Sequence, residues 1–189
     1  MNCDGMGNIY IIVSQTGTML SKILKFITGA QYNHVSLGLS NDLKIMYSFG
    51  RKNAYNPFWG GFVTESADFG TFKRFSKTQV IVLRINVGQQ KQQEIAEQIK
   101  FILENKKRYG YNYFGLCLAG FKIAHKSENR YYCSEFVRDI LQKNGVEGSE
   151  ILKPIVEPIH FLQIPKAHTV YTGRLSTYSP VCTLHNMDA

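Results

Sequence analysis

The amino-acid sequence predicts a single α+β domain in which helices pack against a largely antiparallel sheet. Three observations support this prediction. A chain of 189 residues has room for one sizeable core but not for two comfortable ones. Hydrophobic residues make up 44% of the chain and aromatic residues 13%, which excludes disorder as the main state. Strand-like and helix-like segments follow one another without an internal repeat, a low-complexity linker or a break in composition. We therefore expect one domain over residues 1–189, with a loose tail from about residue 178.

The first half of the chain alternates between two hydrophobic periods. A continuous apolar run at 8–14 predicts a buried strand, and apolar residues at helical spacing over 18–28 predict a helix that stops at Gly29. Two short strands are expected next, at 34–39 and 43–49, joined by the turn-forming residues Ser40, Asn41 and Asp42. The segment 50–77 is rich in glycine, asparagine and aromatic residues and predicts a long excursion with one short strand at 62–65.

The second half begins with the clearest strand, QVIVLRI at 79–85. A helix follows over about 89–105, since Ile95, Ile99 and Ile102 share one face. The remaining expected elements are an apolar helix from the Tyr/Gly/Asn segment 109–113 to about 122, a helix from Cys133 to about Asn144 that stops at Gly145, a loop with one helical turn at 154–165, and a strand at 167–171.

The charge balance is basic, with 22 Lys and Arg against 14 Asp and Glu, a net charge of +8. A positive surface attracts anionic partners such as acidic lipid headgroups, anionic wall polymers or nucleic acid. The densest cluster, 106–108, is only three residues long and is interpreted as a solvated helix end. Because no zinc-finger, RNA-binding or heptad-linked basic pattern is present, nucleic acid is not expected as a partner.

The chain opens without a basic stretch followed by an apolar core, so no signal peptide is recognised and a cytoplasmic location is the default expectation. The longest apolar run, 113–124, is about half of what a membrane span requires. No transmembrane segment is therefore expected.

Cysteine and histidine spacing gives no sign of a metal or cofactor. The four cysteines are Cys3, Cys117, Cys133 and Cys182, and they form no CxxC motif. Four of the five histidines share no spacing with each other or with the cysteines, and are interpreted as surface or structural residues: His125, His160, His168 and His185. Cys117, within Leu-Cys-Leu-Ala, is predicted to lie in the core.

Two residues have the setting that nucleophilic catalysis needs. Cys133, in YYCSEFV, precedes the core stripe of its helix by three residues, and a thiol at a helix N-terminus is biased towards thiolate. His34, in NHVSLGLS, shares a strand face only with small residues, which leaves room for a neighbour or a substrate. If imidazole and thiol meet, the pair can attack a carbonyl group.

The same residues resemble a known family. His-Val-Ser-x-Gly-Leu, Tyr-Ser-Phe-Gly, Tyr-Gly-Tyr-Asn-Tyr and Tyr-Cys-Ser-Glu-Phe-Val, in this order over residues 8–175, are similar to the circularly permuted branch of the NlpC-like papain-fold cysteine peptidases, the bacterial YiiX-like group. Lecithin retinol acyltransferase is a more distant relative. The resemblance implies a permuted papain-like fold, with Cys133 as nucleophile, His34 as base and the N–H group of Cys133 as an oxyanion donor.

The family also implies a third polar residue that orients the histidine, normally an acid, an amide or a second histidine on the neighbouring strand. The strand 44–49 contains none of these types. Ser48 or Tyr47 could accept from the imidazole, depending on the hairpin register, and Glu65 could reach in from the next segment. Ser48 completes the predicted site, with Tyr47 and Glu65 as open alternatives.

The function predicted from this resemblance is a thiol hydrolase of the cysteine peptidase or amidase kind. It would cleave an amide or ester bond in a cell-wall-type peptide, an isopeptide or an acyl-lipid through an acyl-enzyme on Cys133. Two alternatives remain open: transfer of a lipid-derived acyl group to an amine or alcohol, and a non-catalytic module that binds a peptide or lipid in the same groove. The segments 50–77 and 154–165 are expected to build that groove.

Overall fold

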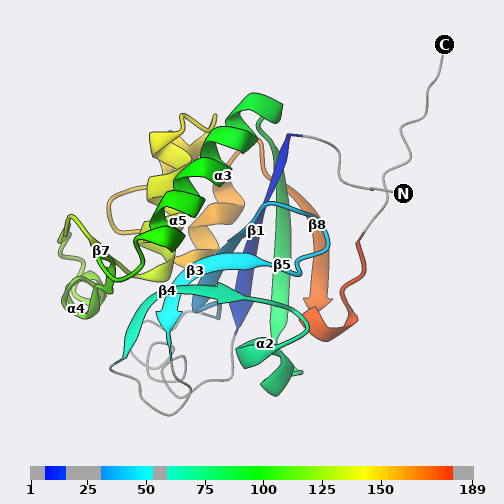
Figure 1. The fold of residues 1–189 in the computed structure, drawn as a ribbon, viewed down its shortest axis with the longest axis horizontal. Helices are drawn as coiled ribbons and strands as arrows, with labels where there is room; N and C mark the ends of the chain where they lie inside the picture. The colour runs from blue at the N-terminus through cyan, green and yellow to red at the C-terminus, as the bar shows by residue number, and fades with distance from the viewer. Residues whose placement is uncertain (1–6, 16–30, 53–58, 181–189) are drawn as a thin grey trace.

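An eight-stranded sheet organises the protein in a computed structural model that describes residues 7–15, 31–52 and 59–180. The strand order is β7-β6-β4-β3-β2-β1-β5-β8, and all neighbours pair antiparallel except β6 and β7 (Figure 1). The strands are β1 (Asn8–Gln15), β2 (His34–Gly38), β3 (Met46–Arg51), β4 (Gly60–Glu65), β5 (Gln79–Asn86), β6 (Gly110–Tyr111), β7 (Arg130–Tyr131) and β8 (His168–Arg174). The α+β prediction is confirmed.

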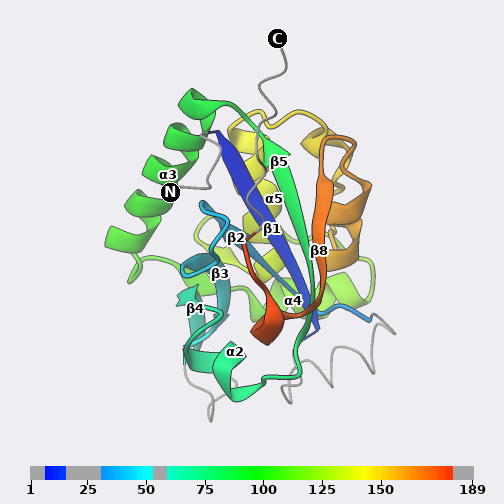
Figure 2. The same ribbon diagram turned by 90° about the vertical axis from the view of Figure 1, so that its right-hand side faces the viewer.

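Helices cover one face of this sheet and a smaller cluster covers the other. The α-helices are α2 (Gly70–Arg74), α3 (Gln89–Glu104), α4 (Tyr113–Gly120) and α5 (Cys133–Lys143), and the 3-10 helices are η1 (Ser149–Ile151), η2 (Pro158–Gln163) and η3 (Leu175–Thr177). Figures 1 and 2 show α3 and α5 on the same side of the sheet, with α2 at the end of the strands. The larger core therefore lies between the sheet and the pair α3 and α5.

Strand β1 is apolar along its whole length because both of its faces are covered. Ile9, Ile11 and Val13 belong to the larger core with α3 and α5. Tyr10 and Ile12 belong to the second cluster, which contains Phe72 of α2, Val80 and Val82 of β5, and Leu175 of η3. A central strand with two buried faces gives a continuous hydrophobic run rather than an alternating one.

Most predicted elements are confirmed to within a few residues, and the differences concern short or edge elements. Strand β8 extends to Arg174, beyond the predicted end at 171. Helix α2 and the two-residue strands β6 and β7 were not predicted, because such short elements have no hydrophobic period of their own. The helix predicted at 18–28 and most of the predicted loose tail lie outside the described residues.

None of the helices within the described residues combines the length and the apolar character that crossing a membrane requires.

Candidate active site

Each of the two predicted catalytic residues is the first residue of its secondary-structure element. His34 is the first residue of β2, and Cys133 is the first residue of α5, which packs against β2 and β3. The side chain of Cys133 is within hydrogen-bonding reach of the His34 imidazole. Residues that are about a hundred positions apart in the sequence thus form one cysteine–histidine pair.

A carboxylate holds the other side of the imidazole. The Nε2 atom of His34 lies 3.0 Å from each of the two carboxylate oxygens of Glu65, the last residue of β4. Ser36 Oγ donates to Glu65 Oε2 at 2.5 Å and lies 3.3 Å from His34 Nε2. Because Nε2 faces Glu65, the Nδ1 atom is left for the thiol. The imidazole thus lies between a thiol and a carboxylate, the kinds of side chain that catalytic triads combine.

The strand register explains how Glu65 reaches a histidine two strands away. Gly38 of β2 pairs with Met46 of β3, and Met46 pairs with Glu65 of β4. Paired residues share a sheet face, and residues two apart on one strand also share it. His34, Ser36 and Glu65 therefore lie on one face of the sheet, where the Glu65 side chain can extend across β3.

The structure does not give Ser48 the predicted orienting role. The Ser48 side chain is buried, and its hydroxyl donates to the carbonyl oxygen of Val35 at 2.8 Å. Tyr47 pairs with Leu37, so it lies on the opposite sheet face, where its ring stacks with Phe62 at 6.1 Å between centroids. Of the three open alternatives, the residue that contacts the imidazole is Glu65.

Electrostatics favour the ionised form of the histidine–glutamate pair. Burial by itself would lower the pKa of His34, but the Glu65 charge and the hydrogen bonds with Cys133 and Glu65 raise that pKa well above its ordinary value. Burial would likewise raise the pKa of Glu65, but the His34 charge and the hydrogen bonds from His34 and Ser36 lower it. Both side chains keep 14% of their surface exposed, so solvent reaches one edge of the pair.

The N-terminus of α5 presents Cys133 with its backbone N–H free of any intrahelical acceptor, as for every first helical residue. Glu135 turns away from the thiol: its Oε2 accepts from the Tyr132 N–H at 3.4 Å and from Asn112 Nδ2 at 3.2 Å. Ser134 does not cap the helix, since its hydroxyl donates to the Val156 carbonyl at 2.6 Å. These contacts fix the first turn of α5 on both sides of the thiol.

Tyr111 is a buried phenol close enough to Cys133 for their charges to interact. Burial, together with the nearby Cys133, raises the pKa of Tyr111 well above its ordinary value, so the phenol stays protonated.

The prediction that Cys117 lies in the core is wrong, because it is exposed on α4. Helix α4 has apolar residues on all sides but is covered on one side only, so the sequence pattern could not identify its exposed face. Among the described residues, no group of three His, Cys, Asp or Glu side chains could hold a metal ion.

The chain matches no protein-family model, and a search of the curated proteins finds no match.

Replacing Glu65 by glutamine should destabilise the protein in a pH-dependent way. The pKa of His34 is higher in the folded state than the ordinary value of 6.5, so protonated His34 stabilises the fold fully below pH 6.5. This contribution is lost as the pH rises through the folded-state pKa. The pKa of Glu65 is lower in the folded state than the ordinary value of 4.5, so ionised Glu65 stabilises the fold fully above pH 4.5. This contribution is lost as the pH falls through the folded-state pKa. The free energy of unfolding should therefore be higher in the unmodified protein than in Glu65→Gln by about 2 kcal/mol. This difference should be largest between pH 4.5 and pH 6.5.

Denaturant titrations at several pH values measure this difference, best in a Cys133→Ala background so that the thiol does not titrate with the imidazole. Glu97→Gln, on the exposed side of α3, is the matched control and should show no such maximum. A difference that is independent of pH would contradict an ion pair between His34 and Glu65.

Proposed function

We propose that the protein is a thiol hydrolase that cleaves an amide or ester bond through an acyl-enzyme on Cys133. The observation that carries this proposal is the line Cys133, His34 and Glu65, with the thiol at a helix N-terminus and the imidazole held by a carboxylate. The resemblance to the permuted NlpC-like cysteine peptidases supports the same chemistry, and cell-wall-type peptides, isopeptides and acyl-lipids remain the proposed substrate classes.

The raised pKa of His34 makes the imidazolium the resting form near neutral pH, and an adjacent imidazolium favours thiolate. In the proposed first step, the Cys133 Sγ attacks the substrate carbonyl carbon, and the carbonyl electron pair moves to the oxygen. The Cys133 N–H would donate to this oxyanion. The C–N or C–O bond then breaks, and His34 gives its proton to the leaving amine or alcohol.

The second half of the proposed cycle uses His34 as a base. The now neutral imidazole takes a proton from water, whose oxygen attacks the thioester carbonyl. Collapse of this intermediate breaks the C–S bond, releases the carboxylic acid and restores the thiolate and the imidazolium. Glu65 keeps Nε2 as the donor throughout, so the other ring nitrogen always faces the reacting atoms.

The Glu65 contact also bears on the non-catalytic alternative. The neighbouring strand β3 has no acidic residue to orient His34, and a missing acid would suit a binding module better than a catalyst. The Glu65 carboxylate reaches the imidazole from β4 instead. A site that only binds a ligand does not require an imidazole held in one orientation. This contact favours catalysis over binding.

Acylation of Cys133 tests the proposal directly. With p-nitrophenyl butyrate as the probe, we expect release of p-nitrophenolate and one butyryl group on the peptide that contains Cys133, detected by mass spectrometry after acid quenching. Cys133→Ala should abolish both signals, whereas Cys117→Ala, which removes an exposed cysteine, should keep both. Unchanged turnover in Cys133→Ala, or a butyryl group found only on another cysteine, would refute the proposal.

Product analysis with glycinamide as an added acceptor separates hydrolysis from transfer. Hydrolysis predicts butyric acid as the main product at every acceptor concentration tested. Butyryl-glycinamide as the main product would favour the acyltransferase alternative.

A further inference from the structure

Helix α4 and the turn after it expose large apolar side chains that a water-soluble surface does not require. Phe114 is 64% exposed, Phe121 79% and Ile123 53%. The ring of Phe114 lies against His125 at 5.1 Å between centroids, in an edge-on arrangement, so the start of α4 meets the turn at 121–126. We call these three exposed side chains the α4 patch: Phe114, Phe121 and Ile123.

The backbone at the end of α4 adopts an unfavourable conformation that leaves Ile123 exposed. Lys122 has φ 61°, the left-handed region that favours glycine. The Lys122 N–H donates to the Ala119 carbonyl at 2.9 Å, and the Ile123 N–H donates to the Leu118 carbonyl at 3.0 Å. This is the Schellman pattern of helix ends, in which the residue at the position of Ile123 usually packs back on the helix. Here Ile123 is exposed instead.

Positive charge is concentrated in the same stretch of chain. Residues 106–130 contain six Lys or Arg and one acidic residue, Glu128, which gives a net charge of +5 out of +8 for the whole chain. Within the described part of the chain, none of these six cations forms a salt bridge. The short cluster at 106–108 is thus part of a larger basic region and not only the solvated end of a helix.

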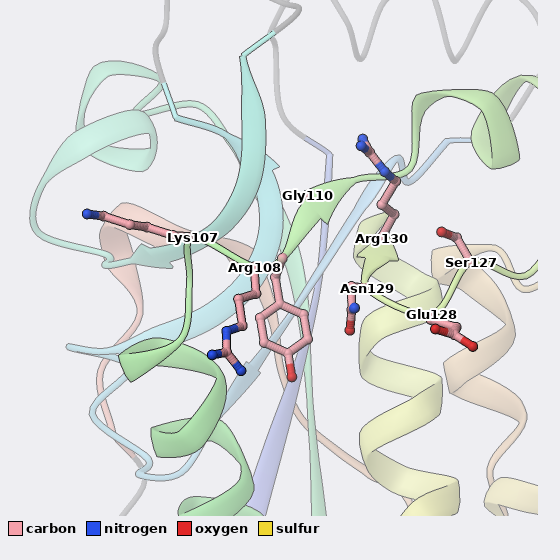
Figure 3. Close-up of a pocket in the computed structure, with 8 residues that line it drawn as sticks. Lys107, Arg108, Gly110, Ser127, Glu128, Asn129 and Arg130 are labelled. Atoms are coloured by element: carbon pink, nitrogen blue, oxygen red, sulfur yellow. The ribbon is translucent and has the colours of Figure 1, made fainter.

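An open cleft of about 490 Å³ joins the cluster at 106–108 to the segment that follows the α4 patch. Figure 3 shows Lys107 and Arg108 on one wall and residues 127–130, with Arg130 among them, on the other. The cleft therefore brings two separate basic segments of the chain together, Lys107 and Arg108 on one side and Arg130 at the start of β7 on the other.

We propose that this region docks onto an anionic lipid membrane surface. The α4 patch would enter the boundary between headgroups and acyl chains, and Lys122, Lys126 and the cations of the cleft would contact anionic headgroups. Aromatic and aliphatic side chains next to lysines are the combination by which interfacial segments bind anionic bilayers. The region would lie on the membrane rather than cross it, since α4 spans only eight residues.

The α4 patch adjoins the first turn of α5, the helix that begins with Cys133. A pocket between them is lined by Gly115 and Ala119 of α4, by Ile123 of the α4 patch, and by Tyr132 and Glu135 at the start of α5. Docking would therefore hold the start of α5 close to the lipid surface. Binding itself needs no thiol, so the membrane proposal and the proposed chemistry can fail independently.

Sedimentation of the full chain with sucrose-loaded vesicles tests the proposal. We expect the protein to pellet with vesicles of phosphatidylcholine and phosphatidylglycerol and to stay in the supernatant with phosphatidylcholine alone. Phe114→Ser with Phe121→Ser should weaken binding at least about tenfold. Lys122→Glu with Lys126→Glu should weaken it by at least about twentyfold, since each lysine near the surface contributes about fivefold.

Lys100→Glu with Phe101→Ser, on exposed positions of α3, is the matched control and should bind like the unmodified protein, as should Cys133→Ala. A protein that stays in the supernatant with every vesicle, or patch variants that bind unchanged, would overturn the proposal. So would a dimer in sedimentation velocity that the two phenylalanine substitutions abolish, because a second copy would then cover the patch.

Discussion

Replacing His34 by alanine is expected to slow acylation of Cys133 by about 10³-fold, within the range that general acid–base catalysis usually contributes. The variant loses both the positive charge that favours thiolate and the proton that the leaving group receives. The measurement is the burst of p-nitrophenolate from p-nitrophenyl butyrate under single-turnover conditions. His34→Gln should be similarly slow, because an amide has the wrong charge and no transferable proton.

His168→Ala, on the exposed face of edge strand β8, is the matched control and should leave the burst unchanged. Circular dichroism of each variant shows whether the fold is kept. A folded His34→Ala protein with the burst rate of the unmodified chain would mean that the imidazole takes no part in acylation.

The second large effect concerns the packing that holds α5 on the sheet. Phe136 is 1% exposed, and its ring lies 5.2 Å from that of Phe49, 5.7 Å from that of Phe62 and 6.3 Å from that of Tyr131. Phe136→Ala should lower the free energy of unfolding by about 4 kcal/mol, because it removes buried apolar surface and leaves a cavity among three aromatic rings.

Urea titration measures this loss, and Phe114→Ala is the control of the same chemical type. Phe114 is largely exposed, so its truncation should change the unfolding free energy by no more than about 0.5 kcal/mol. Equal effects of the two substitutions would contradict the core assignment of α5.

Local patterns were sufficient for the elements that pack through a regular stripe. The apolar run of β1, the helical spacing of Ile95, Ile99 and Ile102 in α3, and the strand at β5 all correspond to buried positions in the structure. Helix α4 was expected, but its exposed side was not, because a helix that is apolar all round gives no amphipathic signal. Its exposure depends on what tertiary structure leaves uncovered.

In the candidate site, too, local sequence predicted some residues, and tertiary structure decided the other. Cys133 and His34 were predicted from their immediate neighbours, a helix start and a strand face of small residues. Glu65 was only one of three alternatives, since its contact with His34 depends on the pairing of β2 with β3 and of β3 with β4. The register of each hairpin decides which side chains share a face, because a one-residue shift moves every side chain of a strand to the opposite face.

The most direct test of the account is the rate of Cys133 alkylation by iodoacetamide, followed by peptide mapping from about pH 5 to about pH 9, a range that includes the free-thiol pKa of about 8.5. Mapping resolves Cys133 from the exposed Cys117, which serves as an internal reference in every sample. At about pH 6, Cys133 should react at least tenfold faster in the unmodified protein than in His34→Ala, and the two rates should converge towards about pH 9. Equal rates in the two proteins at every pH would show that imidazole and thiol do not act as a pair, and would contradict the proposed hydrolase.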